Sequence, residues 1–156
     1  MANVESFQNF DLKISRLINA PRDVVWKAWI DPQRLALWWG PKGFTNPVCK
    51  LDLRPGGSIR IDMRGPDGTV YPMSGQFKEV TVTSRLVFIS SALDQKGKPL
   101  FEVLTTVTFD EEHKKTNLTL NAKVVKTTPD AGQYLSGMSD GWNQSMDRLE
   151  HYVSKS

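Results

Sequence analysis

Residues 18–44 read INAPRDVVWKAWIDPQRLALWWGPKGF and contain two short segments with helical character. Within residues 23–30 the apolar side chains recur at the spacing of one helix face. Asp31-Pro32 interrupts this pattern and begins a second segment, residues 33–39, which Gly40-Pro41 ends. The sequence therefore predicts two short helices that follow each other directly.

The segments on either side of these helices are predicted to be strands. Residues 12–18 precede the helices, with Leu12, Ile14 and Ile18 on one face. After the helices, strand-like segments alternate with short turns, of which Gly65-Pro66-Asp67-Gly68 is the clearest. These segments are residues 44–53, 58–64, 70–82, 85–93, 101–109 and 116–125. Short turns between neighbouring strands predict an antiparallel meander.

A last helix is predicted from Thr128-Pro129 onward, because threonine suits the N-cap and proline the first helical position. Its apolar stripe consists of Leu135, Met138, Trp142, Met146, Leu149 and Val153. Gly137 and Gly141 lie on one face of this helix, although glycine is a poor helix former. Either the helix breaks at these glycines, or another segment approaches them closely.

The order of elements predicts one α+β domain, residues 1–156, in which a curved antiparallel sheet wraps around a long C-terminal helix. Residues 1–11 precede the first strand and are expected to be a flexible N-terminal segment.

The composition argues against several classes of protein. The net charge of +3 is scattered along the chain, so we expect no nucleic-acid partner. The N-terminus does not resemble a signal peptide, and no segment approaches the roughly 20 apolar residues of a membrane span. We therefore expect a cytoplasmic protein without a membrane partner. A single cysteine, Cys49, allows no internal disulfide, and with two histidines it allows no structural zinc site.

One helix does not fill a sheet of this length, so large flexible side chains at the interface are expected to surround a cavity. The candidate lining residues are methionines and aromatic residues: Trp38, Trp39, Phe44, Met63, Tyr71, Met73, Phe88, Met138 and Trp142. The same spacing also fits an ordinary apolar core, which is the commoner use of such side chains.

The adjacent pair Trp38-Trp39 does not fit one core surface, because neighbouring helical side chains point about 100° apart. We expect Trp39 to pack against the core and Trp38 to lie nearer the cavity. Asp140 is the candidate polar residue at the cavity mouth, and the alternative is a surface carboxylate.

No catalytic set is apparent in the sequence. His113 lies in a charged loop, and His151 lies in the last turn of the final helix, where a cation favours the helix dipole. Nothing near Cys49 in the sequence identifies groups that would lower the pKa of its thiol. We therefore assign no catalytic residue, metal or cofactor and expect a binding protein rather than an enzyme.

Five segments together resemble a known family. They are INAPRDVVWKAWIDPQRLALWWGPKGF (18–44), LDLRPGGSIRIDMRGPDGTVYPMSGQF (51–77), RLVF (85–88), LTTVTFDE (104–111) and SDGWNQSMDRLEHYV (139–153). In order and spacing they resemble the START-like (SRPBCC) superfamily, and within it the family named for homology to the activator of the heat-shock-protein-90 ATPase. This resemblance implies the helix-grip fold.

The resemblance also implies what such a protein does. The superfamily holds apolar or aromatic ligands between the sheet and the C-terminal helix, so we expect binding of a hydrophobic small molecule. An alternative is a co-chaperone-like interaction module that acts on the heat-shock-protein-90 ATPase. A lesser alternative is a cyclase- or hydrolase-like enzyme that uses the same cavity. A homodimer formed through an open edge of the sheet also stays an alternative.

Overall fold

The computed structural model describes residues 11–154, without the side chains of residues 130, 133 and 134. Residues 1–10, most of the segment expected to be flexible, lie outside the described residues, whereas Asp11 already pairs with Lys123 in the sheet. Within residues 11–154, no helix has both the length and the apolar character that a bilayer crossing requires.

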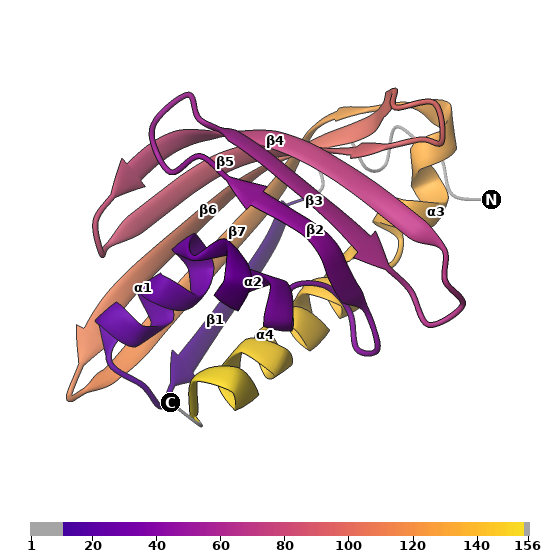
Figure 1. Ribbon diagram of the computed structural model, residues 1–156. Coiled ribbons are helices and arrows are strands. Elements are labelled where there is room, and N and C mark those ends of the chain that lie inside the picture. Colours follow the sequence, from indigo (N-terminus) through magenta and orange to yellow (C-terminus); the bar gives the residue numbers. More distant parts are fainter. Residues whose placement is uncertain (1–10, 155–156) are drawn as a thin grey trace.

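The chain forms one strand, two helices, six further strands and a helical C-terminal region (Figure 1). The strands are β1 (Asp11–Ile18), β2 (Thr45–Leu51), β3 (Ser58–Arg64), β4 (Val70–Thr81), β5 (Arg85–Leu93), β6 (Pro99–Glu112) and β7 (Lys115–Thr127). The helices are α1 (Arg22–Ile30), α2 (Pro32–Trp38), the 3-10 helix η2 (Pro129–Ala131), α3 (Gly132–Leu135) and α4 (Met138–Ser154). Neighbouring strands are antiparallel in the order β1-β7-β6-β5-β4-β3-β2, so the predicted meander is confirmed.

The sheet curves around the helices, which confirms the predicted α+β helix-grip architecture. In Figure 1 it arches over α1, α2 and α4, which lie on its concave side. Along β6, Val103, Thr105, Val107 and Phe109 are buried, while the residues between them are more exposed. Because side chains alternate across a strand, these four residues form the inward face of β6.

Aromatic side chains of α1 and α2 fill one part of the groove under the sheet. Trp26 packs edge-on against Phe109, with ring centroids 5.3 Å apart. Trp29 packs against Trp38 at 4.8 Å, also edge-on. Each of these three tryptophans is at most 3% exposed, so their rings are core.

The hairpin between β6 and β7 is tighter than the sequence predicted. His113 and Lys114 have φ angles of 53° and 65°, which fits a two-residue turn of the type that matches the twist of a hairpin. Glu112 therefore pairs directly with Lys115, and both strands extend to the turn. The sequence shows no glycine at this turn, which is why a longer loop was predicted.

The predicted last helix is divided into two. α3 ends at Leu135 and α4 begins at Met138, so the helix breaks at Ser136-Gly137. Gly141 lies inside α4, and a Cβ atom there would be 3.7 Å from Cγ of Pro41, an ordinary contact. Gly137 therefore lies at the break between the two helices. Gly141 lies within α4, where the loop after α2 approaches the helix closely.

Candidate functional site

A cavity of about 370 Å³ lies between the sheet and α4. Its walls come from the loop after α2, from β3 to β6 and from the first turns of α4. Met63 lies near the end of β3, Tyr71 near the start of β4, Ala92 near the end of β5 and Leu100 near the start of β6. The cavity therefore occupies the part of the groove that the tryptophans of α1 and α2 leave unfilled.

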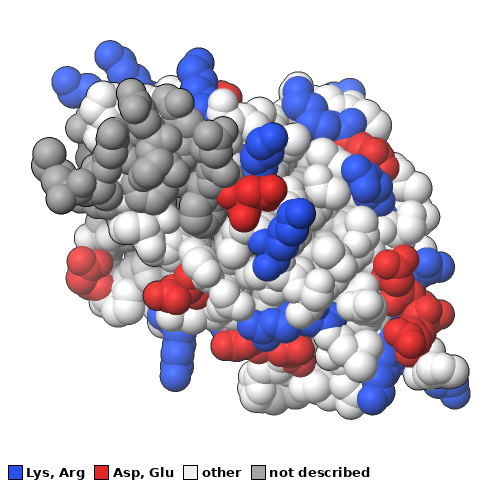
Figure 2. Space-filling model, turned by 180° about the vertical axis from the view of Figure 1, so that it is seen from behind, with Lys and Arg blue, Asp and Glu red and all other residues white. Residues whose placement is uncertain are grey.

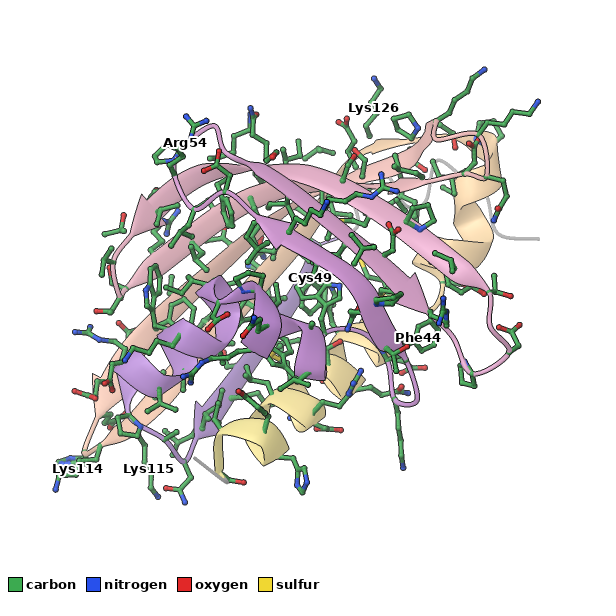
Figure 3. The ribbon with its side chains drawn as sticks, viewed as in Figure 1. Phe44, Cys49, Arg54, Lys114, Lys115 and Lys126 are labelled. Atoms are coloured by element: carbon green, nitrogen blue, oxygen red, sulfur yellow. The ribbon has the colours of Figure 1, made fainter. Side chains whose placement is uncertain are left out.

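Seven of the nine predicted lining residues lie around this cavity: Trp39, Phe44, Met63, Tyr71, Met73, Met138 and Trp142. Phe44, labelled in Figure 3 next to the start of β2, packs against Tyr71 with ring centroids 5.9 Å apart. Trp39 meets Trp142 edge to face at 5.3 Å. These aromatic pairs connect the loop after α2 to both the sheet and α4.

The expected order of the tryptophan pair is wrong. Trp38 is fully buried outside the cavity wall, and its Nε1 donates a hydrogen bond of 3.0 Å to the carbonyl of Ala28. Trp39 is 8% exposed and lines the cavity. The reason is the end of α2, because Trp38 is its last helical residue and faces α1. Trp39 has extended backbone angles, which turn its ring away from α1 and toward α4.

Phe88 also lies away from the cavity, contrary to the prediction. Its ring centroid is 6.4 Å from those of Trp39 and Phe77 and 6.5 Å from that of Trp29. It borders a separate void of about 20 Å³ in the core. Phe88 faces inward as the strand pattern indicated, but it lies deeper along the groove, where the aromatic side chains close it.

Asp140 does not line the cavity. It is exposed in the first turn of α4, although the next residue, Gly141, belongs to the cavity wall. Successive helical side chains point about 100° apart, so the two residues face different surroundings. A carboxylate at this position interacts favourably with the positive N-terminal end of the helix dipole. Asp140 is therefore a surface carboxylate, the alternative expected from the sequence.

Three hydroxyl-bearing residues in the wall were not among the predicted ones: Ser90, Thr105 and Ser145. Thr105 is 1% exposed, and its Oγ1 has no hydrogen-bond partner among the described protein atoms. Ser145 Oγ donates a hydrogen bond of 2.9 Å to the carbonyl of Gly141. The alternation of β6 carried a signal for Thr105, because it has the same parity as the apolar residues Val103 and Val107.

Arg148 of α4 holds the loop that forms one wall. Its Nη1 lies 3.0 Å from each of the carbonyl oxygens of Trp39, Gly40 and Pro41, and its Nη2 donates to the carbonyl of Leu37 at 3.2 Å. These carbonyls are at the C-terminal end of α2, where the helix dipole is negative and a cation is favourable. Burial lowers the pKa of the Arg148 guanidinium. In the sequence, a single arginine on an amphipathic helix gave no sign of this role.

The charged side chains of the described residues lie outside the cavity wall. None of its described lining residues is Asp, Glu, Lys, Arg or His. Figure 2 shows acidic and basic side chains interspersed over one face of the molecule. Within the described part of the chain, no three His, Cys, Asp or Glu side chains are grouped to hold a metal ion. The cavity can therefore bind through apolar contact and neutral hydrogen bonds.

The thiol of Cys49 is not activated. Cys49 lies on β2 (Figure 3), and burial, together with the charge of Asp31, raises the pKa of its thiol to about 11. A nucleophilic cysteine requires a lowered pKa, because the thiolate is the reactive form. Cys49 is therefore a structural side chain at neutral pH.

Solved structures share this fold over nearly their whole length. A protein from Nitrosomonas europaea is 29% identical, with a TM-score of 0.79 over 93% of this chain and 94% of that one. A protein from Arthrobacter aurescens is 24% identical, with a TM-score of 0.83 over 100% of this chain and 91% of that one. The AHSA1 protein from Silicibacter pomeroyi is 24% identical, with a TM-score of 0.75 over 93% of this chain and 98% of that one.

The family follows from the sequence as well as from the fold. A comparison with proteins of curated function finds no significant match. The model of the AHSA1 family, described as Activator of Hsp90 ATPase homolog 1-like protein, matches residues 19–154. The resemblance seen in the sequence is confirmed, and the chain belongs to the AHSA1 family of helix-grip proteins.

Proposed function

We propose that this protein binds a hydrophobic or aromatic small molecule in the cavity between the sheet and α4. The observation that carries the proposal is the cavity itself: about 370 Å³, bordered mainly by aromatic, methionine and aliphatic side chains. Protein interiors contain few voids larger than a water molecule, and ligand sites are typically concave, mostly apolar and few per protein. A cavity of this size is better explained by a binding role than by a defect in packing.

The walls also suit binding. Edge-to-face contact between Trp39 and Trp142 supports one side, and Arg148 ties the loop after α2 to α4. Met63 and Met138 give other sides flexible side chains that adapt to the shape of a ligand. Rigid and adaptable parts together lower the entropic cost of binding and tolerate different apolar shapes.

The surface gives less support to a protein-interaction role. Among the described residues, the large apolar side chains with high exposure are Leu17, Leu37, Val82 and Val125. They belong to β1, α2, the turn after β4 and β7, so they come from four separate segments. Protein interfaces usually present contiguous apolar patches, and this distribution favours the cavity as the functional site.

The experiment uses an uncharged fluorescent reporter, N-phenyl-1-naphthylamine, whose emission rises in apolar surroundings. We expect saturable binding to the wild-type protein with one site per chain. Ala92→Phe places a ring in the cavity from β5, a position where phenylalanine suits the strand, and we expect at least a tenfold loss of affinity. Ser91→Phe is the matched control, because the next side chain along a strand points to the opposite face.

Two results would contradict the proposal. One is the lack of saturable binding by the wild-type protein. The other is equal binding by the Ala92→Phe and Ser91→Phe variants, provided that thermal unfolding shows both to be folded. That second result would place the reporter elsewhere on the molecule.

A further inference from the structure

The most informative polar side chain of the cavity wall is Thr105, whose hydroxyl is buried. The side chain is 1% exposed, borders the cavity and has no hydrogen-bond partner among the described protein atoms. It projects from the middle of β6, between the inward-facing Val103 and Val107. Burial of a hydroxyl without a hydrogen bond costs free energy, so this position favours a partner inside the cavity. A threonine hydroxyl can both donate and accept such a bond.

The surroundings of Thr105 restrict what that partner is. Ser145 uses its hydroxyl hydrogen in a bond to the carbonyl of Gly141, so its oxygen is left as an acceptor. Ser90 lies on β5 opposite Val103, one inward-facing position along from the pair formed by Thr105 and Phe88. Tyr71 adds a phenol hydroxyl, so the polar side-chain groups of the described wall are neutral hydroxyls in an otherwise apolar lining.

The absence of charge among the described lining residues decides the class of ligand. Transfer of an ionised group into such a cavity, without a partner of opposite charge, is far less favourable than transfer of a neutral hydrogen-bonding group. Carboxylates, phosphates and amines therefore have no counter-ion in this wall. A neutral oxygen that meets Thr105 removes the cost of the unpaired hydroxyl.

We propose that the cavity selects an uncharged, largely apolar molecule with a hydroxyl or carbonyl oxygen that hydrogen-bonds to Oγ1 of Thr105. This inference rests on the proposed function, because it names the chemical class of ligand for the same cavity. Apolar contact supplies most of the affinity, and Thr105 sets the orientation of the ligand. Specificity for an oxygen-bearing ligand then comes from one buried hydrogen bond.

The test compares three probes of similar size that displace N-phenyl-1-naphthylamine at pH 7. 2-Naphthol is uncharged and carries a hydroxyl, 2-methylnaphthalene lacks the oxygen, and 2-naphthoate is an anion. We expect 2-naphthol to bind about three- to tenfold more tightly than 2-methylnaphthalene, the range that one net hydrogen bond provides. We expect 2-naphthoate to bind most weakly of the three.

Thr105→Val keeps the shape of the side chain and removes only its hydroxyl. In this variant we expect the preference for 2-naphthol over 2-methylnaphthalene to fall to about one, with the affinity for 2-methylnaphthalene kept. Thr105→Ser retains the hydroxyl and is expected to retain the preference. Ser91→Ala is the control, because Ser91 lies on the opposite face of β5 outside the cavity wall, and it is expected to behave as the wild type.

The outcomes separate this inference from the proposed function. A wild-type protein that does not bind N-phenyl-1-naphthylamine refutes the proposed function and this inference with it. Reporter binding combined with an unchanged preference in Thr105→Val refutes only the role of Thr105. Displacement by 2-naphthoate as strong as that by 2-naphthol refutes the selection of uncharged ligands.

Discussion

Arg148→Met is expected to destabilise the protein more than any removal of a surface charge, although Arg148 has no ion pair with a carboxylate in the described part of the chain. Methionine retains much of the apolar stem but removes every donor. The carbonyls of Leu37, Trp39, Gly40 and Pro41 then lose their common partner. The loop after α2 loses its connection to α4 through this side chain.

The magnitude follows from the geometry of the guanidinium. Three carbonyl oxygens lie 3.0 Å from Nη1 of Arg148, but this nitrogen has only two hydrogens, so the three bonds do not add. Hydrogen bonds to charged groups contribute about 1.5–3 kcal/mol each. The side chain is only partly buried, and water can replace part of what is lost. We therefore expect a decrease of about 2–3 kcal/mol in the free energy of unfolding, which for a chain of this size is about 5–10 °C in Tm.

Urea unfolding followed by tryptophan fluorescence measures this change, with equal m-values as the condition for comparison. Arg85→Met is the matched control, because Arg85 is 46% exposed and forms a 3.2 Å surface ion pair with Glu79. Such pairs contribute about 0–1 kcal/mol. Arg148→Lys keeps the charge but not the planar fork, and is expected to fall between wild type and Arg148→Met. If Arg148→Met costs no more than Arg85→Met, the bonds to the loop carbonyls do not stabilise the fold and the reasoning is refuted.

Two further predictions concern the tryptophan pair and the cysteine. Trp38→Phe is expected to lower the free energy of unfolding by about 1–3 kcal/mol, because it removes the bond to Ala28 and core volume, and to leave reporter affinity nearly unchanged. Trp39→Phe is expected to lower reporter affinity more than Trp38→Phe does. If titrations give the opposite ranking, Trp38 and not Trp39 lines the cavity, and the assignment is refuted. Cys49, whose thiol has a pKa of about 11, is expected to react with iodoacetamide at pH 8 about a hundredfold more slowly than a free thiol. Because thiolate forms as the pH rises toward this pKa, the rate should increase about tenfold per pH unit up to pH 10, and rapid labelling at pH 7 would contradict the assigned burial.

The sequence predicted the fold well because the fold depends on repeated local patterns. The alternation of apolar and polar side chains repeats along every strand, and within residues 18–44 prolines mark the limits of the two helices. Small errors at the ends of these elements therefore do not change the topology. The β6–β7 turn at His113-Lys114 was predicted as a loop, because no glycine marks the positive φ angles that it requires.

The site was predicted less completely because it depends on where single side chains lie in three dimensions. Trp38 and Trp39 are neighbours with identical chemistry, and only the end of α2 separates core from cavity. The side chain of Phe88 points into the groove as expected, but the contacts with Trp29 and Trp39 place its ring in the core and not at the cavity. The partners of Arg148 are backbone carbonyls more than a hundred residues away, and side-chain patterns do not report such contacts.

The segment from Trp38 to Pro41 connects the stability of this protein to its binding site. The ring of Trp38 is fixed in the core by Ala28, and the carbonyls of the next three residues are fixed by Arg148. The cavity wall formed by Trp39, Gly40 and Pro41 is therefore held in place before a ligand arrives, and binding does not have to order it. The bonds from Arg148 thus stabilise the fold and also lower the cost of binding, so Arg148→Met is expected to lose affinity although Arg148 does not line the cavity.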